Sequence, residues 1–173
     1  MDNNVLSKLT TGMFVVTSAF EDKTNAFIAN SLVQVASEPT VLSLSVFGKN
    51  FSKELIQNSK KFNVSILSTD ATIDFIRALG YKSGRDVDKL AKVKFTKGEN
   101  GVPAVTQGAC GYLECEVINE VDLESCIVFF AKLTNAVYLD SKDPMTSEYY
   151  QKALEGKLPP SSPGWSARYV KEK

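Results

Sequence analysis

The chain is built largely from short apolar and β-branched segments that are separated by turn-forming residues. Segments of this length and composition are typical of β-strands, and polar residues between the first two predict a β-hairpin. Helical segments are few and do not alternate regularly with the predicted strands, which disfavours a doubly wound parallel sheet. We therefore predict a mainly β (α+β) fold, an antiparallel barrel or sandwich with a few short helices. Strands are expected at residues 13–20, 26–36, 41–47, 62–67, 92–95, 104–106, 111–119 and 125–139.

The segment at 41–47 shows the alternation of a half-buried strand. Leu42, Leu44 and Val46 point to one face, and the opposite face carries serine hydroxyl groups. We expect the leucine and valine side chains to lie in the core.

Capping residues delimit three predicted helices. A helix at 51–59 has Asn50 or Ser52 at its start and buries Leu55 and Ile56. The other predicted boundaries are Asp70 and Gly80 for the second helix, and Asp143, Pro144 and Gly156 for the third.

The composition fits one domain and excludes several classes of function. With 173 residues and no internal repeat or linker, we expect a single domain over residues 1–173. The 20 basic and 20 acidic residues balance, and no segment is long and apolar enough to span a bilayer, so neither nucleic acid nor membrane is an expected partner. The chain has no histidine, which removes histidine-based nucleophilic catalysis and histidine-ligated zinc or haem.

The cysteines indicate a reducing compartment. Cys110, Cys115 and Cys126 are an odd number without a C-x-x-C motif, so neither a disulfide framework nor a four-cysteine metal site can form within one chain. We expect a soluble, cytoplasmic protein without a metal site.

One polar residue precedes the apolar segment at 26–36, and two others interrupt it. Asn25, Asn30 and Ser31 carry amide and hydroxyl groups that could meet the edge of a heteroaromatic ligand. The alternative is that they belong to a hairpin turn and face solvent.

A predicted strand runs through a glycine turn into a helix start at residues 45–52. Free backbone N–H groups at a helix N-terminus attract phosphate, and Lys49 and Ser52 would add a charge and a hydroxyl group. Many strand-to-helix turns of this kind bind nothing.

A second polar turn, residues 83–86, also has the chemistry of a phosphate site. Gly84 permits close approach of the backbone, and the Arg85 guanidinium suits bidentate phosphate contact. The alternative is an exposed turn with an ion pair between Arg85 and Asp86.

Neither a dinucleotide-binding nor a P-loop fingerprint is present. The chain instead resembles the flavin reductase-like FMN-binding split-barrel family, especially its flavoredoxin and high-molecular-weight rubredoxin branch. The resemblance covers most of the chain and rests on the order and spacing of several segments. These are residues 8–17 (KLTTGMFVVT), 25–26 (NA), 30–31 (NS), 38–40 (EPT), 45–52 (SVFGKNFS), 83–89 (SGRDVDK), 144–146 (PMT) and 149–150 (YY).

The resemblance implies a Greek-key split β-barrel that forms a homodimer, with noncovalent FMN near the dimer interface. Asn30 and Ser31 would lie along the isoalloxazine ring, and Lys49, Ser52 and Arg85 would surround the phosphate. The full set of expected cofactor-binding residues is Asn25, Asn30, Ser31, Ser45, Val46, Lys49, Asn50, Ser52, Ser83, Gly84, Arg85, Cys126 and Trp165.

The implied function is an oxidoreductase of the flavin reductase type. Electrons would pass from NADH or NADPH through the flavin to free flavin, a ferric species or a small iron–sulfur protein in trans. Because the cofactor performs this chemistry, no catalytic side chain is required and the lack of histidine is no obstacle.

Cys126 departs from the family pattern, since members commonly have a histidine at this place. The departure leaves open a non-enzymatic FMN-binding electron carrier that a partner protein reduces, and a buried strand cysteine is the simplest interpretation of Cys126 alone. An FMN-free interaction domain is a third hypothesis. Trp165 stands where the family's C-terminal tail has an aromatic residue, which would cover the flavin or the partner subunit; a loosely packed tail is the alternative.

Overall fold

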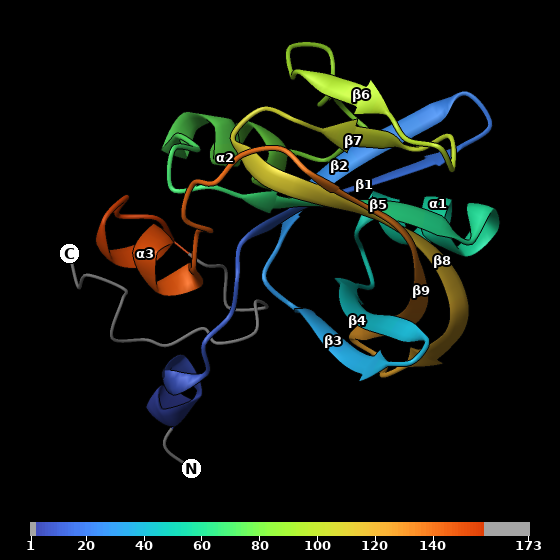
Figure 1. Ribbon diagram of the computed structural model, residues 1–173, viewed down its shortest axis with the longest axis horizontal. Helices are drawn as coiled ribbons and strands as arrows, with labels where there is room; N and C mark the ends of the chain where they lie inside the picture. Colours follow the sequence, from blue (N-terminus) through green and yellow to red (C-terminus); the bar gives the residue numbers. More distant parts are fainter. Residues whose placement is uncertain (1–2, 158–173) are drawn as a thin grey trace.

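The computed structural model describes residues 3–157, whose strands form a seven-stranded sheet and a two-stranded one. The large sheet has the order β2-β1-β5-β8-β9-β4-β3, and all neighbouring strands are antiparallel. This sheet curls strongly, and short helices lie around it (Figure 1). In chain order the elements are the 3-10 helix η1 (Asn3–Lys8), β1 (Phe14–Phe20), β2 (Lys23–Ala29), β3 (Leu32–Ser37), β4 (Thr40–Phe47), α1 (Phe51–Ser59), β5 (Lys61–Leu67), α2 (Ile73–Gly80), β6 (Phe95–Lys97), β7 (Pro103–Val105), β8 (Ala109–Asp122), β9 (Cys126–Tyr138) and α3 (Ser147–Lys152).

The two edge strands of the large sheet, β2 and β3, are neighbours in sequence but do not pair with each other. β2 pairs with β1 as far as the Phe14–Ala29 pair, and β3 pairs with β4 from Leu32 onward. The prediction of one continuous strand at 26–36 is therefore wrong. Pairing with β1 ends at Ala29, and the chain crosses from one edge of the sheet to the other through Asn30 and Ser31. We call this gap between the edge strands the seam.

The core has two parts, because both faces of β1 are covered. Val16 points into the curled sheet, whereas Val15 packs under α2 and α3. The predicted inward face of β4 is confirmed: Leu42, Leu44 and Val46 are buried in the inner core with Phe62 and Phe129. The second core includes Met13, Leu67, Phe75, Ile76, Leu79, Met145 and Tyr150.

Helix α1 has the predicted bounds, and Asn50 is its N-cap. The Ser52 backbone N–H donates to Asn50 Oδ1 over 2.9 Å. Leu55 and Ile56 are buried as expected.

The predicted starts of α2 and α3 are wrong. Thr72, not Asp70, caps α2 by accepting from Phe75 N, whereas Asp70 pairs with Lys142. Pro144 does not begin α3 but bridges to Ser68, because residues 144–146 extend the sheet before the helix starts.

Three more strand boundaries shift. β2 begins at Lys23 rather than at residue 26, because residues 23–25 already pair with β1. β6 begins at Phe95 rather than at residue 92, since it pairs with β7 only from Phe95 opposite Val105 onward. β8 extends three residues beyond the predicted end, to Asp122. None of the helices between residues 3 and 157 is long and apolar enough to cross a membrane.

Candidate functional site

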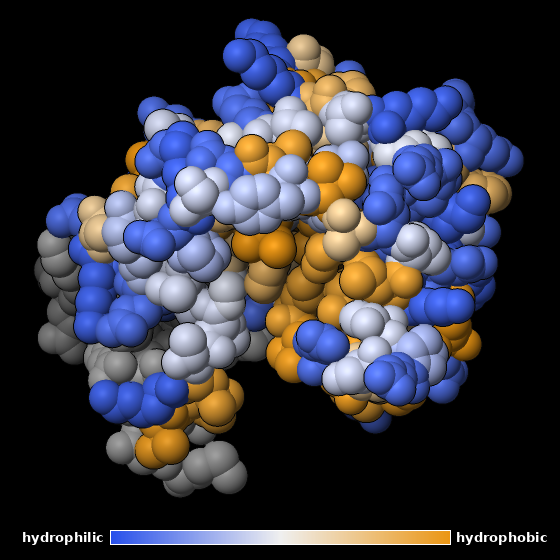
Figure 2. Space-filling view, in the orientation of Figure 1, coloured by the Kyte–Doolittle hydropathy of each residue, from blue (hydrophilic) through white to orange (hydrophobic). Residues whose placement is uncertain are grey.

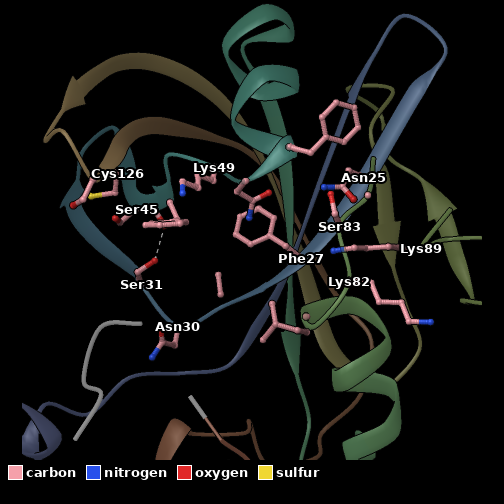
Figure 3. Close-up of a pocket in the computed structure, with 18 residues that line it drawn as sticks. Asn25, Phe27, Asn30, Ser31, Ser45, Lys49, Lys82, Ser83, Lys89 and Cys126 are labelled. Atoms are coloured by element: carbon pink, nitrogen blue, oxygen red, sulfur yellow. Dashed lines mark hydrogen bonds between the residues drawn. The ribbon is translucent and has the colours of Figure 1, made fainter. Parts of the chain in front are cut away.

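A cavity of about 570 Å³ lies at the seam. Its walls come from β2, the Asn30–Ser31 crossing, β4, the turn that leads into α1, residues 80–89 and the start of β9. Figure 3 shows Cys126 and Ser45 at one end of the cavity and Asn25, Ser83 and Lys89 at the other. Its volume is within the range of small-molecule and cofactor sites.

Most of the residues expected from the sequence to bind a cofactor meet in this cavity, although they come from distant segments. Ser31 Oγ donates to the Ser45 carbonyl oxygen over 2.8 Å, which ties the crossing to β4 (Figure 3). The expected residues that line the cavity are Asn25, Asn30, Ser31, Ser45, Lys49, Asn50, Ser83, Gly84 and Cys126.

Three expected residues that the structure describes are not part of this wall. Val46 is fully buried in the inner core, and the Ser52 hydroxyl is buried behind the wall, where it accepts from Ser18 Oγ and Asn25 Nδ2. Arg85 lies in a neighbouring groove. Trp165 lies outside the described residues.

Arg85 is held by an ion pair rather than left free for a phosphate. Its guanidinium donates to both carboxylate oxygens of Glu54 and lies 4.7 Å from the centre of the Phe51 ring. The hydrogen bond from Arg85 holds the pKa of the exposed Glu54 carboxyl below its usual value. The sequence suggested Asp86 as the ionic partner, and this is wrong, because α1 brings Glu54 closer.

Asn25 has an unused hydrogen-bond acceptor at the wall of the cavity. The side chain is 2% exposed, and its Nδ2 donates to Ser52 Oγ over 3.0 Å, but its Oδ1 has no partner among the described residues. Gly84 packs directly against this oxygen, so that a Cβ atom at Gly84 would overlap it. The backbone of Gly84 was predicted to approach another group closely, and in the structure that group is the Asn25 amide. The buried Asn25 oxygen lacks a hydrogen-bond donor, which a ligand hydroxyl group could supply.

The cavity is cationic although the chain as a whole is neutral. Lys49, Lys82 and Lys89 line it, and no Asp or Glu of residues 3–157 does. Lys89 is the half-buried one, and its Nζ donates to the carbonyl oxygens of Ala26 (2.9 Å) and Leu79 (2.7 Å). Burial lowers the pKa of Lys89 to about 8. Such a cavity favours an anionic ligand.

The sequence analysis missed Lys82, Lys89 and the aromatic wall residue Phe27. Phe27 lies in the apolar part of β2, which indicates a buried residue but not that it lines a cavity. The two lysines follow α2 in a polar segment that contains no local sign of which side chains turn inward.

A model of the flavin reductase like domain matches residues 6–156. The chain belongs to the flavin reductase-like family. This confirms the resemblance, and the chain is accordingly a reductase-like oxidoreductase that works through flavin-based electron transfer. Its mainly antiparallel fold with few short helices is the split barrel of this family.

Relatives of this flavin reductase-like chain include several redox proteins. It is 31% identical, over its whole length and 76% of the other chain, to the high molecular weight rubredoxin of Moorella thermoacetica. It is 28% identical, over 92% of its length and 94% of the other chain, to the ferric-chelate reductase (NAD(P)H) of Archaeoglobus fulgidus. Among solved structures it is similar to flavin reductase PheA2, with a TM-score of 0.70 and 27% identity over 83% of this chain and 88% of that one.

Proposed function

We propose that the seam cavity binds FMN and that the protein passes electrons from NADH or NADPH, through this flavin, to free flavin, a ferric species or a small iron–sulfur protein. The observation that carries the proposal is the cavity itself, to which residues 3–157 contribute three lysines, no acidic side chain and an Asn25 oxygen that has no partner among them. When bound, the flavin supplies the redox chemistry, and the side chains bind and orient it.

The phosphate is expected near the N-terminus of α1. Asn50 Oδ1 already accepts from Ser52 N, and the Ser52 hydroxyl is buried, so Lys49 is the side chain best placed to hold the charge. Arg85 is expected to contribute less, because its guanidinium is paired with Glu54. Beside the first turn of α1, Asn25 Oδ1 would accept from a hydroxyl group of the ribityl chain, which satisfies this buried atom.

FMN binding is tested on the purified protein by adding FMN, desalting and recording the absorbance of bound flavin. We expect a yellow protein, and Lys49→Met is expected to weaken FMN binding roughly tenfold, the loss of one charge-assisted hydrogen bond. Lys53→Met is the matched control, because Lys53 lies in α1 but does not line the cavity. A protein that retains no flavin and whose melting temperature FMN does not change would favour the FMN-free interaction domain instead.

The second candidate function, an electron carrier that a partner protein reduces, is favoured by Cys126. This residue begins β9 and lines the cavity, at the place where the family resemblance leads us to expect an imidazole. We expect Cys126→His to raise steady-state NADH or NADPH oxidation in excess FMN, because an imidazole adds a hydrogen-bonding group that could position the nicotinamide. Cys126→Ser should leave FMN affinity nearly unchanged. If Cys126→His oxidises the nicotinamide no faster than the wild type, the missing imidazole does not limit nicotinamide oxidation, and Cys126 gives no support to the electron carrier.

We also propose that the protein is a homodimer that buries the edge strand β3. Val33 and Val35 are 57% and 51% exposed there, and hydrophobic side chains gather around this part of the molecule (Figure 2). Val33→Glu should give a monomer in light scattering after gel filtration, since the charge would be buried in the interface. Phe95→Glu, on β6 at the opposite side of the molecule (Figure 1), should remain dimeric. A monomeric wild type would contradict the proposal.

Residues 1–173 are further proposed to form one domain that acts in the cytoplasm. All three cysteines are free, which suits a reducing compartment.

A further inference from the structure

Lys89 is the cavity lysine whose position is fixed by hydrogen bonds. Its side chain enters the cavity from the segment after α2, and its nitrogen points toward Phe27 and Ser83 (Figure 3). Two of its N–H groups donate to the carbonyl oxygens of Ala26 in β2 (2.9 Å) and Leu79 in α2 (2.7 Å). The third position of the tetrahedral nitrogen has no partner among the described residues.

This geometry lets the side chain lose a proton without losing a hydrogen bond. As an ammonium, Lys89 has three N–H groups, and one of them is not bonded to a described residue. As a neutral amine it has two, and both stay on the carbonyl oxygens of Ala26 and Leu79. The lone pair then takes the third position. A neutral amine held in this way is a nucleophile, whereas an ammonium is not.

The described wall of the cavity has no carboxylate that would stabilise the charged form of Lys89. Its other charged groups are Lys49 and Lys82, which add positive charge. Asp88, the preceding residue, is exposed, and its Oδ1 accepts from Leu90 N. Burial lowers the pKa of Lys89 to about 8, so about a tenth of these side chains are neutral at neutral pH, against fewer than about one in a thousand for a lysine in water.

The rest of the cavity determines which carbonyl compound suits this amine. Its volume of about 570 Å³ is large enough for a small molecule that contains a ring. Lys49 and Lys82 are exposed side chains of the same wall, and their charges favour a ligand with an anionic group. A small aldehyde that carries a carboxylate or phosphate group meets both conditions.

We propose that Lys89 is a reactive amine and that the seam cavity forms an imine with small aldehydes that carry an anionic group. The neutral nitrogen attacks the aldehyde carbon, and the aldehyde oxygen leaves as water with the two amine hydrogens. A carbon–nitrogen double bond remains, and a proton from solvent gives the protonated imine. Its single N–H group can donate to the carbonyl oxygen of Ala26 or Leu79. The reaction needs neither an oxidant nor a reductant, and it does not require bound flavin.

The experiment treats the full chain with para-carboxybenzaldehyde, reduces any imine with borohydride and locates the labelled lysines by peptide mass spectrometry. We expect Lys89 to be labelled at least roughly tenfold faster than Lys49 or Lys82. Lys89→Arg should lose this label, because a guanidinium keeps the charge and the hydrogen-bond donors but stays protonated. Lys82→Arg is the matched control and should retain the label at Lys89. Benzaldehyde, which has no anionic group, should label Lys89 roughly fivefold more slowly.

Two results would overturn the proposal. One is equal labelling of Lys89, Lys49 and Lys82 in the wild type, a comparison that does not depend on whether Lys89→Arg folds. The other is labelling of Lys89 by benzaldehyde at least as fast as by para-carboxybenzaldehyde, which would reject the anionic class.

The same labelling separates this proposal from the proposed function. Added FMN should slow the labelling of Lys89, because both molecules would occupy the seam cavity. A chain that binds FMN but is not labelled at Lys89 without it would reject the imine and leave the proposed function standing. A chain that is labelled at Lys89 but binds no FMN would reject the proposed function alone.

Discussion

Gly84→Ala is expected to weaken FMN binding roughly 10- to 100-fold, equivalent to about 1.5–3 kcal/mol. The new Cβ atom would overlap Asn25 Oδ1. Either the buried Asn25 amide turns and loses its hydrogen bond to Ser52 Oγ, or the segment around Gly84 moves away from the cavity. Both rearrangements change the wall that Asn25 and Gly84 share. Isothermal titration with FMN measures the effect.

A double-mutant cycle with Asn25→Ala isolates this contact. Asn25→Ala removes the amide that the new methyl group would meet, so adding Gly84→Ala to it should lower the melting temperature little further. If the single Gly84→Ala variant keeps the wild-type affinity for FMN and the wild-type melting temperature, the prediction is wrong. The Asn25 amide and the segment around Gly84 can then move apart without loss of binding or stability.

Glu114→Ala is expected to lower the free energy of unfolding by about 3 kcal/mol, because it leaves buried donors without an acceptor. Glu114 is 1% exposed, and its carboxylate accepts from Glu99 N (3.1 Å), Asn100 N (2.9 Å) and Asn135 Nδ2 (3.2 Å). The bonds from Glu99 and Asn100 fix the turn between β6 and β7 to β8, and the bond from Asn135 links β8 to β9. Urea denaturation measures the change.

Glu116→Ala is the matched control for Glu114→Ala. Glu116 is exposed two residues further along β8, and its replacement should change the free energy of unfolding by less than about 0.5 kcal/mol. Similar effects of the two substitutions would mean that the carboxylate of Glu114 does not hold the turn.

The sequence predicted the parts of the fold that local patterns determine. The alternation of Leu42, Leu44 and Val46 identified the inner face of β4, and the Asn50 cap identified the start of α1. These signals are local, because a strand repeats every second residue and a cap bonds within its own first turn. The residues expected at the cavity were predicted mainly from the family resemblance. Most of them lie close together in the structure, which agrees with that resemblance.

The remaining errors concern features that depend on distant partners. The break at Asn30 and Ser31 is determined by where β1 begins, at Phe14, and the ion pair of Arg85 depends on the position of Glu54 in α1. The inward direction of Lys89 depends on carbonyl groups of β2 and α2. The residues adjacent to these positions in the sequence do not contain that information.

The seam also has a consequence for the order of folding. The cavity wall joins β2 and the Asn30–Ser31 crossing to residues 80–89 and to the start of β9, which come much later in the chain. Contacts of this kind close long loops of chain and form late. The cavity therefore forms only when the sheet is complete. A ligand of this cavity binds the folded chain and not a partly folded one.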